Sequence, residues 1–506
     1  MKMLTSREPF AKYCSAEDFA KIKEYDTVSQ MWLHCIEEYA EDTAIEDSGV
    51  KYSFSKLDED VACFRTLLKD DSDKKLRVGI YCKNSYDFVK AYLAVVTLGY
   101  CAVILPPQLD APTVFGCSMK FSLDKLVYAP DMEENLGVLR SQRPDFITVS
   151  AADTSDTKTD IVIPEGSDPC VIMFTGGTTG KSKGALLSNT AVMQGTVNGC
   201  YGYETVFHQR YLLVLPLSHV FGLIRNLMTS LYTGSDLYIC RNNKDMFKDV
   251  AVFRPTILVL VPALAEMSLM LSKKFGRNML GESLKYIIAG AAAVSPYLIK
   301  EYETQLGVKL LQGYGLTESA NLVSGNPESL RKPDSVGLLY PNQEIRIVDG
   351  ELWLKGKNMM DGYVGEDETG VYSEDGWFKT GDLVRIDEEG YLYITGRIKE
   401  IIILSNGENI SPAELEVHFN KPDFIQDSQV FEDVDENGSH FLSLEVVPRA
   451  AIIETMGLSD PADFIKTELE KINTTLQPYE RVQRIVVRTS DFERTPSMKI
   501  KRYKKC

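Results

Sequence analysis

The sequence predicts an α/β fold with a large N-terminal domain of parallel, doubly wound sheets and a small β unit, followed by a small mobile α+β domain. Between residues 28 and 395, short apolar runs alternate with amphipathic segments, as in successive βα units of a parallel sheet. From about residue 336 to 395 the spacing changes to short alternating strands, typical of an antiparallel unit. With 506 residues, the chain is too long for one hydrophobic core.

The expected elements follow from the periodicity of apolar residues. In the N-terminal part we expect strands at 77–82, 170–174, 211–215, 256–261 and 284–289, and helices at 86–98, 220–232, 263–273 and 296–306. The antiparallel unit includes strands at 351–354 and 391–394. In the C-terminal part we expect helices at 412–420 and 462–476, a hairpin of 429–431 with 440–447, and a strand at 484–488.

Composition excludes several classes of protein. A formal net charge of −17 argues against nucleic-acid binding, which normally needs a basic face. The longest apolar stretch, residues 257–271, contains Pro262 and Glu266 and is too short to span a bilayer. Ten cysteines without a C-x-x-C pair, and no secretory signal, predict a cytoplasmic enzyme with free thiols. Five scattered histidines give no zinc motif.

Residues 175–184 read Thr-Gly-Gly-Thr-Thr-Gly-Lys-Ser-Lys-Gly and follow the apolar run 170–174. Glycines allow a ligand to approach the backbone closely, while amide groups, hydroxyls and ammonium groups attract anions. This segment is therefore predicted to bind nucleotide phosphates. A Walker A loop requires glycine where Thr175 stands, so a P-loop NTPase is the weaker alternative.

The loop resembles the phosphate loop of the adenylate-forming superfamily, which contains acyl- and aryl-CoA synthetases, luciferases and peptide-synthetase adenylation domains. Further segments resemble the motifs of this superfamily in its chain order, at residues 216–222, 312–318, 350–363, 376–382, 396–399 and 495–499. The resemblance extends from near residue 28 to the C-terminus. It implies an AMP-binding domain over residues 1–396 and a lid domain over 397–506 that carries the catalytic lysine.

The resemblance implies an AMP-forming acid–thiol ligase that uses ATP and Mg²⁺. Such an enzyme makes acyl-AMP and pyrophosphate from a carboxylic acid, and then transfers the acyl group to a thiol, with CoA favoured. The alternative is an enzyme that activates amino or aryl acids for the phosphopantetheine of a separate carrier protein. Residues 217–221 contain no carboxylate to hold a substrate ammonium, which favours an acyl or aryl acid. A non-catalytic relic is disfavoured, because every motif keeps its charged residues.

Site residues are carried over position by position from the resemblance. Catalytic roles are expected for Lys499, His219, Thr178 and Glu318, and metal binding for Glu318 and Thr178. Nucleotide or CoA contacts are expected at Thr175, Gly176, Gly177, Thr178, Thr179, Gly180, Lys183, Ala291, Ala292, Gln312, Gly313, Tyr314, Gly315, Thr317, Asp382, Arg397, Lys399, Gly407 and Lys499. The acid pocket is expected at Ser218, His219, Val220, Phe221, Ala291, Gly313, Gly315, Leu316 and Val323.

Several of these residues have specific expected roles. Tyr314 offers a flat face to adenine, Asp382 accepts from the ribose hydroxyls, and Arg397 donates on the ribose or α-phosphate side. Lys499 bridges the attacking carboxylate and the α-phosphate, and Lys399 is expected to be the hinge between the domains. The sequence departs from the family pattern at Gly176 and Met498, where serine and glycine are usual, and by one additional residue near Gly407.

Overall fold

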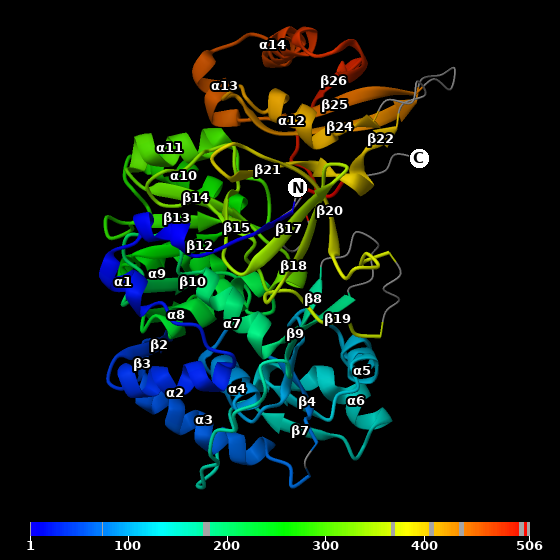
Figure 1. Cartoon of the computed structure of the whole chain (residues 1–506). Coiled ribbons are helices and arrows are strands. Elements are labelled where there is room, and N and C mark those ends of the chain that lie inside the picture. The colour runs from blue at the N-terminus through cyan, green and yellow to red at the C-terminus, as the bar shows by residue number, and fades with distance from the viewer. Residues whose placement is uncertain are drawn as a thin grey trace.

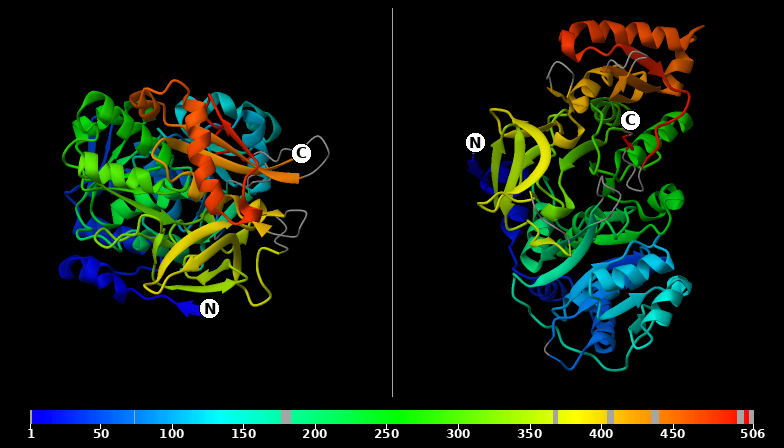
Figure 2. Two further views of the ribbon diagram at one scale, coloured as in Figure 1. Left: turned by 90° about the horizontal axis from the view of Figure 1, so that it is seen from above. Right: turned by 90° about the vertical axis from the view of Figure 1, so that its right-hand side faces the viewer.

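The computed structural model describes residues 2–72, 74–175, 183–365, 370–403, 409–434, 440–494 and 500–502. The chain is built from two large sheets and a smaller C-terminal sheet, arranged in three tiers (Figures 1 and 2). The seven-stranded sheet lies at the bottom of Figure 1, the fourteen-stranded sheet occupies the middle, and the C-terminal part forms the top. This confirms the predicted α/β class.

The seven-stranded sheet has the order β19-β9-β8-β5-β4-β6-β7. Its parallel strands are β4 (Arg77–Tyr81), β5 (Cys101–Ile104), β6 (Lys125–Tyr128), β7 (Ile147–Ser150) and β8 (Pro169–Thr175), and its antiparallel strands are β9 (Lys183–Ser188) and β19 (Gly362–Tyr363). The helices of this region are α2 (Val28–Glu38), α3 (Phe54–Leu68), α4 (Tyr86–Val96), α5 (Ala111–Lys120) and α6 (Gly137–Gln142).

The predicted phosphate loop joins β8 to β9, and Thr175 at the end of β8 pairs with Lys183 at the start of β9. A P-loop instead leads from a strand into a helix. Because residues 183–188 form an antiparallel strand, the P-loop NTPase alternative is wrong.

The fourteen-stranded sheet contains a parallel half formed by β2 (Thr43–Asp47), β10 (Arg210–Leu213), β11 (Asp236–Ile239), β12 (Ile257–Leu260), β13 (Tyr286–Ala289) and β14 (Lys309–Tyr314), with β3 (Val50–Ser53) antiparallel at one edge. Its helices are α7 (Asn189–Asn198), α8 (Thr229–Tyr232), α9 (Met246–Phe253), α10 (Pro262–Phe275), α11 (Pro296–Leu306) and the π-helix η3 (Phe221–Met228). Alternate residues of these strands belong to two different hydrophobic clusters, so the half is buried on both faces.

The antiparallel half contains β1 (Lys2–Leu4), β15 (Ser324–Gly325), β16 (Gly337–Leu339), β17 (Gln343–Val348), β18 (Glu351–Gly356), β20 (Phe378–Ile386) and β21 (Tyr391–Arg397). Its antiparallel character is as predicted. It is not a separate unit, however, because β15 pairs with β14 and continues the parallel half. The sequence periodicity of each strand gave no information on this long-range pairing.

The C-terminal part has its own hydrophobic core, with Phe419, Leu444 and Leu469 fully buried. Its elements are β22 (Ile402–Ile403), β23 (Asn409–Ile410), α12 (Pro412–Phe419), β24 (Ile425–Val434), β25 (His440–Pro448), α13 (Ala450–Met456), α14 (Pro461–Thr475) and β26 (Arg484–Val487). The predicted hairpin is present as β24 and β25, although β24 begins at Ile425, earlier than expected.

This part rests on α10 and α11 (Figure 1). Arg449 lies 3.7 Å from the Glu266 carboxylate on α10, and its guanidinium carbon is 4.4 Å from the ring centre of Tyr297 on α11. Near the chain connection, the Ser411 hydroxyl donates to the Thr395 carbonyl at 2.8 Å. These contacts hold the two parts in one orientation.

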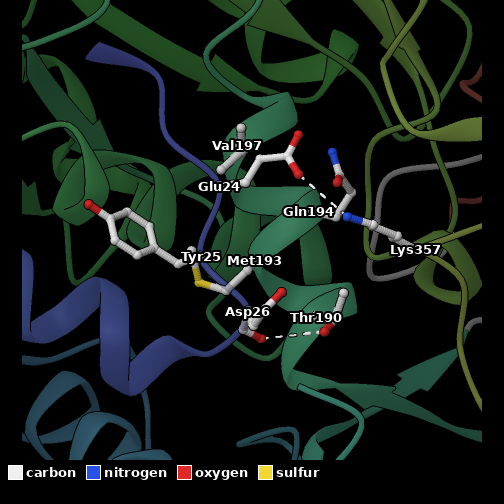
Figure 3. Close-up of a pocket in the computed structure, with 8 residues that line it drawn as sticks. All are labelled: Glu24, Tyr25, Asp26, Thr190, Met193, Gln194, Val197 and Lys357. Atoms are coloured by element: carbon white, nitrogen blue, oxygen red, sulfur yellow. Dashed lines mark hydrogen bonds and ion pairs between the residues drawn. The ribbon is translucent and has the colours of Figure 1, made fainter. Parts of the chain in front are cut away.

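A small cavity lies between α7, residues 24–26 and Lys357 (Figure 3). Its volume of about 10 Å³ leaves room for roughly one water molecule, too little for a substrate. Within the described residues, no helix combines the length and apolar character needed to cross a membrane.

Candidate active site

The predicted site residues gather at the carboxyl ends of β13 and β14, where parallel α/β sheets commonly bind ligands. Ala291 follows β13 with φ +67°, a left-handed conformation that residues other than glycine rarely adopt. Its side chain is exposed, and Ala292 beside it is half-buried. Strained backbone of this kind is concentrated at functional sites.

The two glycines that flank Tyr314 are required by close packing of the chain on itself. A Cβ at Gly315 would lie 1.1 Å from the carbonyl oxygen of Asn321, and one at Gly313 would lie 2.9 Å from that of Ser324. The turn after β14 could not close with larger residues. These glycines therefore shape the segment that carries Thr317 and Glu318, contained in the short helix η5 (Thr317–Ser319).

Asp382 is the centre of a hydrogen-bonded group. The strands β20 and β21 place Asp382 opposite Arg397, and the Arg397 Nε lies 2.7 Å from Asp382 Oδ1. The Tyr314 hydroxyl donates to Asp382 Oδ2 at 2.5 Å. Burial, together with the Asp382 charge, raises the pKa of Tyr314, which keeps its hydroxyl protonated as a donor. The three residues are thus fixed relative to one another.

A second group joins three segments that are far apart in the sequence. The Tyr363 hydroxyl donates to Glu318 Oε1 at 2.5 Å, and the Lys183 ammonium lies 4.7 Å from the centre of the Tyr363 ring. The Met360 N–H also donates to the Glu318 carbonyl at 2.8 Å, which fixes residues 360–363 against η5. A cation, an aromatic ring and a carboxylate are therefore in successive contact beside the end of the predicted phosphate loop.

The acid segment forms the turn before η3. Ser218, Val220 and Phe221 are buried. The His219 N–H donates to the Pro216 carbonyl at 3.0 Å, while its own carbonyl accepts from Leu223 at 2.9 Å.

The Phe221 ring covers Gly290, where an added Cβ would lie 3.2 Å from the ring. Leu316 is half-buried and packs against the same hydrophobic cluster. The acid segment therefore faces the carboxyl ends of β13 and β14.

Two predicted residues are occupied elsewhere. The Gln312 amide group donates to the carbonyls of Pro333 and Ser335, both at 2.7 Å, and so fixes a neighbouring loop. Val323 is fully buried in the hydrophobic core of the antiparallel half. The Gln312 amide is thus engaged by the loop, and the Val323 side chain by the core on which Tyr314 also packs.

Seven predicted residues lie outside the described residues: Gly176, Gly177, Thr178, Thr179, Gly180, Gly407 and Lys499. The segment that holds Lys499 is nevertheless fixed at both ends. Arg494 pairs with Ile500 in an antiparallel bridge, and the Arg494 guanidinium binds Asp427 at 2.5 Å. Arg502 binds the buried Glu416 at 2.6 Å and also Glu400, at 3.0 Å.

Lys399 is exposed in the short helix η6 (Ile398–Glu400), between the large sheets and the C-terminal core. Two further residues, Tyr363 and Arg225, were not among the site residues predicted from the sequence. Tyr363 lies within a recognised motif, but only its contacts with Glu318 and Lys183 connect it to the predicted site. Arg225 on η3 is fully buried, and its position in an apolar helix was the available signal.

Fold and site together define an α/β enzyme in which Glu318 and Tyr314, at the end of β14, lie between the paired Asp382 carboxylate and the Tyr363 ring beside Lys183. A model of the AMP-binding enzyme family matches residues 33–364. The chain belongs to this family.

Two curated relatives are 4-coumarate–CoA ligase-like proteins of Arabidopsis thaliana. 4-Coumarate–CoA ligase-like 6 is 28% identical over 94% of this chain and 89% of the relative. 4-Coumarate–CoA ligase-like 9 is 32% identical over 80% of this chain and 75% of the relative. The structure of ATP-bound MatB from Rhodopseudomonas palustris aligns with a TM-score of 0.81 and 22% identity, over 94% of this chain and 97% of that one. The predictions of an adenylate-forming enzyme and of an acid–thiol ligase are confirmed.

Proposed function

We propose that this protein joins a carboxylic acid to the thiol of CoA in two half-reactions. In the first, a carboxylate oxygen attacks the α-phosphorus of ATP, the bond to the bridging oxygen breaks, and pyrophosphate leaves. In the second, the thiol gives up its proton and its sulfur attacks the acyl carbon, and AMP leaves with the electron pair of the broken C–O bond. CoA is favoured over a carrier protein because the relatives are named CoA ligases.

The observation that carries this proposal is the group around Asp382. Each carboxylate oxygen can accept two hydrogen bonds, and one position on each is taken, by Arg397 and by Tyr314. Both oxygens therefore retain capacity for the two ribose hydroxyls of ATP. Because its hydroxyl is fixed, Tyr314 holds its ring in one orientation, in which it can pack against adenine. The Arg397 side chain is 40% exposed and is available to the α-phosphate side.

The second group fits the triphosphate and its metal. Lys183 supplies positive charge for the β- and γ-phosphates, together with the predicted Thr178 and Thr179. Tyr363 occupies one position on Glu318 Oε1 and leaves Oε2 for a hard cation. Mg²⁺ bound there would neutralise phosphate charge, the main requirement of phosphoryl transfer. Within the described residues, no three Asp, Glu, His or Cys side chains gather around a metal site, so the remaining ligands would come from phosphate, Thr178 or water.

We assign Lys499 to the first half-reaction, with residues 397–506 acting as the lid that carries it. Its ammonium would stabilise charge that develops between the attacking carboxylate and the α-phosphate. Arg494 and Ile500, the described residues on either side of its segment, pair with each other in an antiparallel bridge, which supports this assignment to the C-terminal part. Once acyl-AMP has formed, this lid would turn to admit the thiol past Gly407, and Lys399 lies at the connection.

Pyrophosphate release with a panel of carboxylic acids, with and without CoA, tests the proposed reaction. Lys499→Ala should slow acyl-AMP formation by about 10²–10³-fold and spare thioester formation from supplied acyl-AMP. Lys501→Ala is the matched control, because this nearby lysine is 48% exposed and contacts only the exposed Glu493 in its salt bridge at 3.5 Å. Equal losses in both half-reactions would contradict the role of Lys499.

A further inference from the structure

Arg225 on η3 is a buried cation without a counter-charge among the residues that the structure describes. Its side chain is 1% exposed, and none of its three guanidinium nitrogens has a hydrogen-bond partner in the described part of the chain. Arginine stays protonated in proteins and supplies only donors. Buried charges are normally paired, because an unpaired one loses its hydration without compensation. The missing partner is therefore a feature to explain.

The surroundings of Arg225 are aromatic. Its guanidinium carbon lies 5.5 Å from the ring centre of Tyr203 and 5.9 Å from that of Tyr211, and Tyr203 stacks on Tyr286 at 4.9 Å. Contacts between a cation and these ring faces offset part of the cost of burial. These partners are neutral hydroxyl-bearing rings, so the guanidinium has no anionic acceptor among the described residues.

Arg225 lies on η3, beyond the predicted acid segment. Phe221, one helical turn earlier on η3, covers Gly290 at the carboxyl end of β13. Tyr286 is the first residue of β13 and lies on the same face, four residues from Gly290, which corresponds to about 13 Å. Register places Tyr211 of β10 at the level of Tyr286, through Ile257 of β12. The helix η3 thus runs from the reacting end of the site to Arg225.

The strip between these two ends is apolar. Ile288 lies between Gly290 and Tyr286 on the same face of β13, and Leu311 of β14 belongs to the same buried cluster. A ligand along this strip would meet hydrocarbon in its middle and a guanidinium at its end.

We infer that the acid substrate carries a second anionic group at its far end, and that Arg225 binds it. The inference rests on the proposed function and specifies its substrate class, an acid with one carboxylate for activation and another oxyanion at the opposite end. Side chains of the apolar strip would contact the part in between. The donors of Arg225 would then be satisfied only when substrate is bound.

The test compares acids in pairs. A length series of α,ω-dicarboxylic acids and carboxy-substituted aromatic acids is assayed for pyrophosphate release, each beside the monocarboxylic acid of the same length. For the wild type, kcat/KM should favour one or more diacids by about 10- to 100-fold, the value of a charge-assisted hydrogen bond. Arg225→Met should abolish that advantage, chiefly through KM, and Arg225→Lys should retain part of it.

Arg65→Met is the matched control for loss of a buried arginine. Arg65 is 2% exposed and donates to the Thr159 carbonyl at 2.8 Å and the Thr97 hydroxyl at 3.0 Å, so its loss should lower stability but leave the diacid preference intact. Should Arg225→Met fail to fold, the wild-type preference alone decides. Preference for the monoacid at every length would overturn this inference alone, as would an equal effect of Arg225→Met on both acids. If none of the monocarboxylic or dicarboxylic acids supported pyrophosphate release, the proposed function would be overturned as well.

Discussion

Asp382 and Arg397 are register partners on adjacent strands, joined at 2.7 Å, yet they differ sharply in exposure. The Asp382 side chain is 2% exposed, whereas that of Arg397 is 40% exposed. The Asp382 carboxylate is buried within the protein, whereas part of the Arg397 side chain reaches the solvent. Burial would lower the pKa of Arg397, but Asp382 outweighs this and the pKa is raised, so the pair stays ionised.

Asp382→Asn should raise the KM for ATP by at least about tenfold, since the amide offers one acceptor oxygen in place of two and loses the charge that orients Arg397. Initial rates against ATP concentration measure this. Asp387→Asn is the control. Asp387 directly follows β20 and forms an ion pair with Lys332, which lowers its carboxyl pKa to about 2. Its contacts do not involve Tyr314 among the described residues. An unchanged KM for ATP in the Asp382 variant would contradict its ribose role.

Tyr363→Phe keeps the ring beside Lys183 but removes the donor to Glu318. A hydrogen bond to a charged group contributes about 1.5–3 kcal/mol, so the orientation of Glu318 should suffer. We expect the Mg²⁺ concentration for half-maximal rate to rise about tenfold, with a smaller change in the KM for ATP. Tyr372→Phe provides a comparison from the same region, because its hydroxyl contacts the Met360 carbonyl at 3.4 Å. Identical Mg²⁺ titrations for wild type and Tyr363→Phe would contradict the metal assignment.

Glu266 should make the packing of the C-terminal part against α10 depend on pH. Burial raises the pKa of this carboxyl from 4.5 to about 7, against the opposing charge of Arg449. With the C-terminal part packed on α10, the Glu266 carboxyl therefore keeps a proton that it releases when exposed. The stability of the packed arrangement falls as pH rises from about 4.5 to 7. Glu266→Gln should flatten this dependence.

Thermal unfolding and hydrogen exchange of α10 and α13 between pH 4.5 and 8 measure the effect. Glu303→Gln is the control, since Glu303 lies on α11 with a side chain 54% exposed. Parallel pH profiles for wild type and Glu266→Gln would show that this carboxyl does not govern the interface.

Lys399→Pro tests the hinge. Proline fixes φ and restricts Ile398 before it, so the C-terminal part should be trapped in one orientation. We expect one half-reaction to be impaired, most readily thioester formation, while the other is spared. Lys399→Ala should behave as wild type, because this exposed side chain is not the source of the effect. Wild-type rates for both half-reactions in the proline variant would place the hinge elsewhere.

Local patterns predicted the elements well. The apolar runs at 77–82 and 284–289 became β4 and β13, and the helix at 296–306 has the expected bounds. Local patterns could not predict which strands pair over long distances, such as β15 with β14, because pairing depends on the whole chain.

The same limit applies to the site. The motifs selected Asp382 and Arg397 as separate residues, and their pairing with Tyr314 required three strands to be placed. Gln312 lies in a motif, yet its amide supports a neighbouring loop through the carbonyls of Pro333 and Ser335, contacts over about 20 residues that the motif does not reveal. Arginine is usually a surface residue, and although the apolar helix around Arg225 was a signal in the sequence, its burial is established by the structure.

The pairing of β1 with β17 joins Lys2 to Arg346, the opposite ends of a very long stretch of chain. At roughly 5–20 residues per second, a ribosome needs on the order of 20–70 s to deliver the second strand after the first. Likewise β2, near the beginning, pairs with β11, which emerges much later. During synthesis, the edges of β1 and β2 are therefore unpaired until β17 and β11 have been made. Recombinant production should therefore benefit from an added chaperone, which shields those edges during that interval.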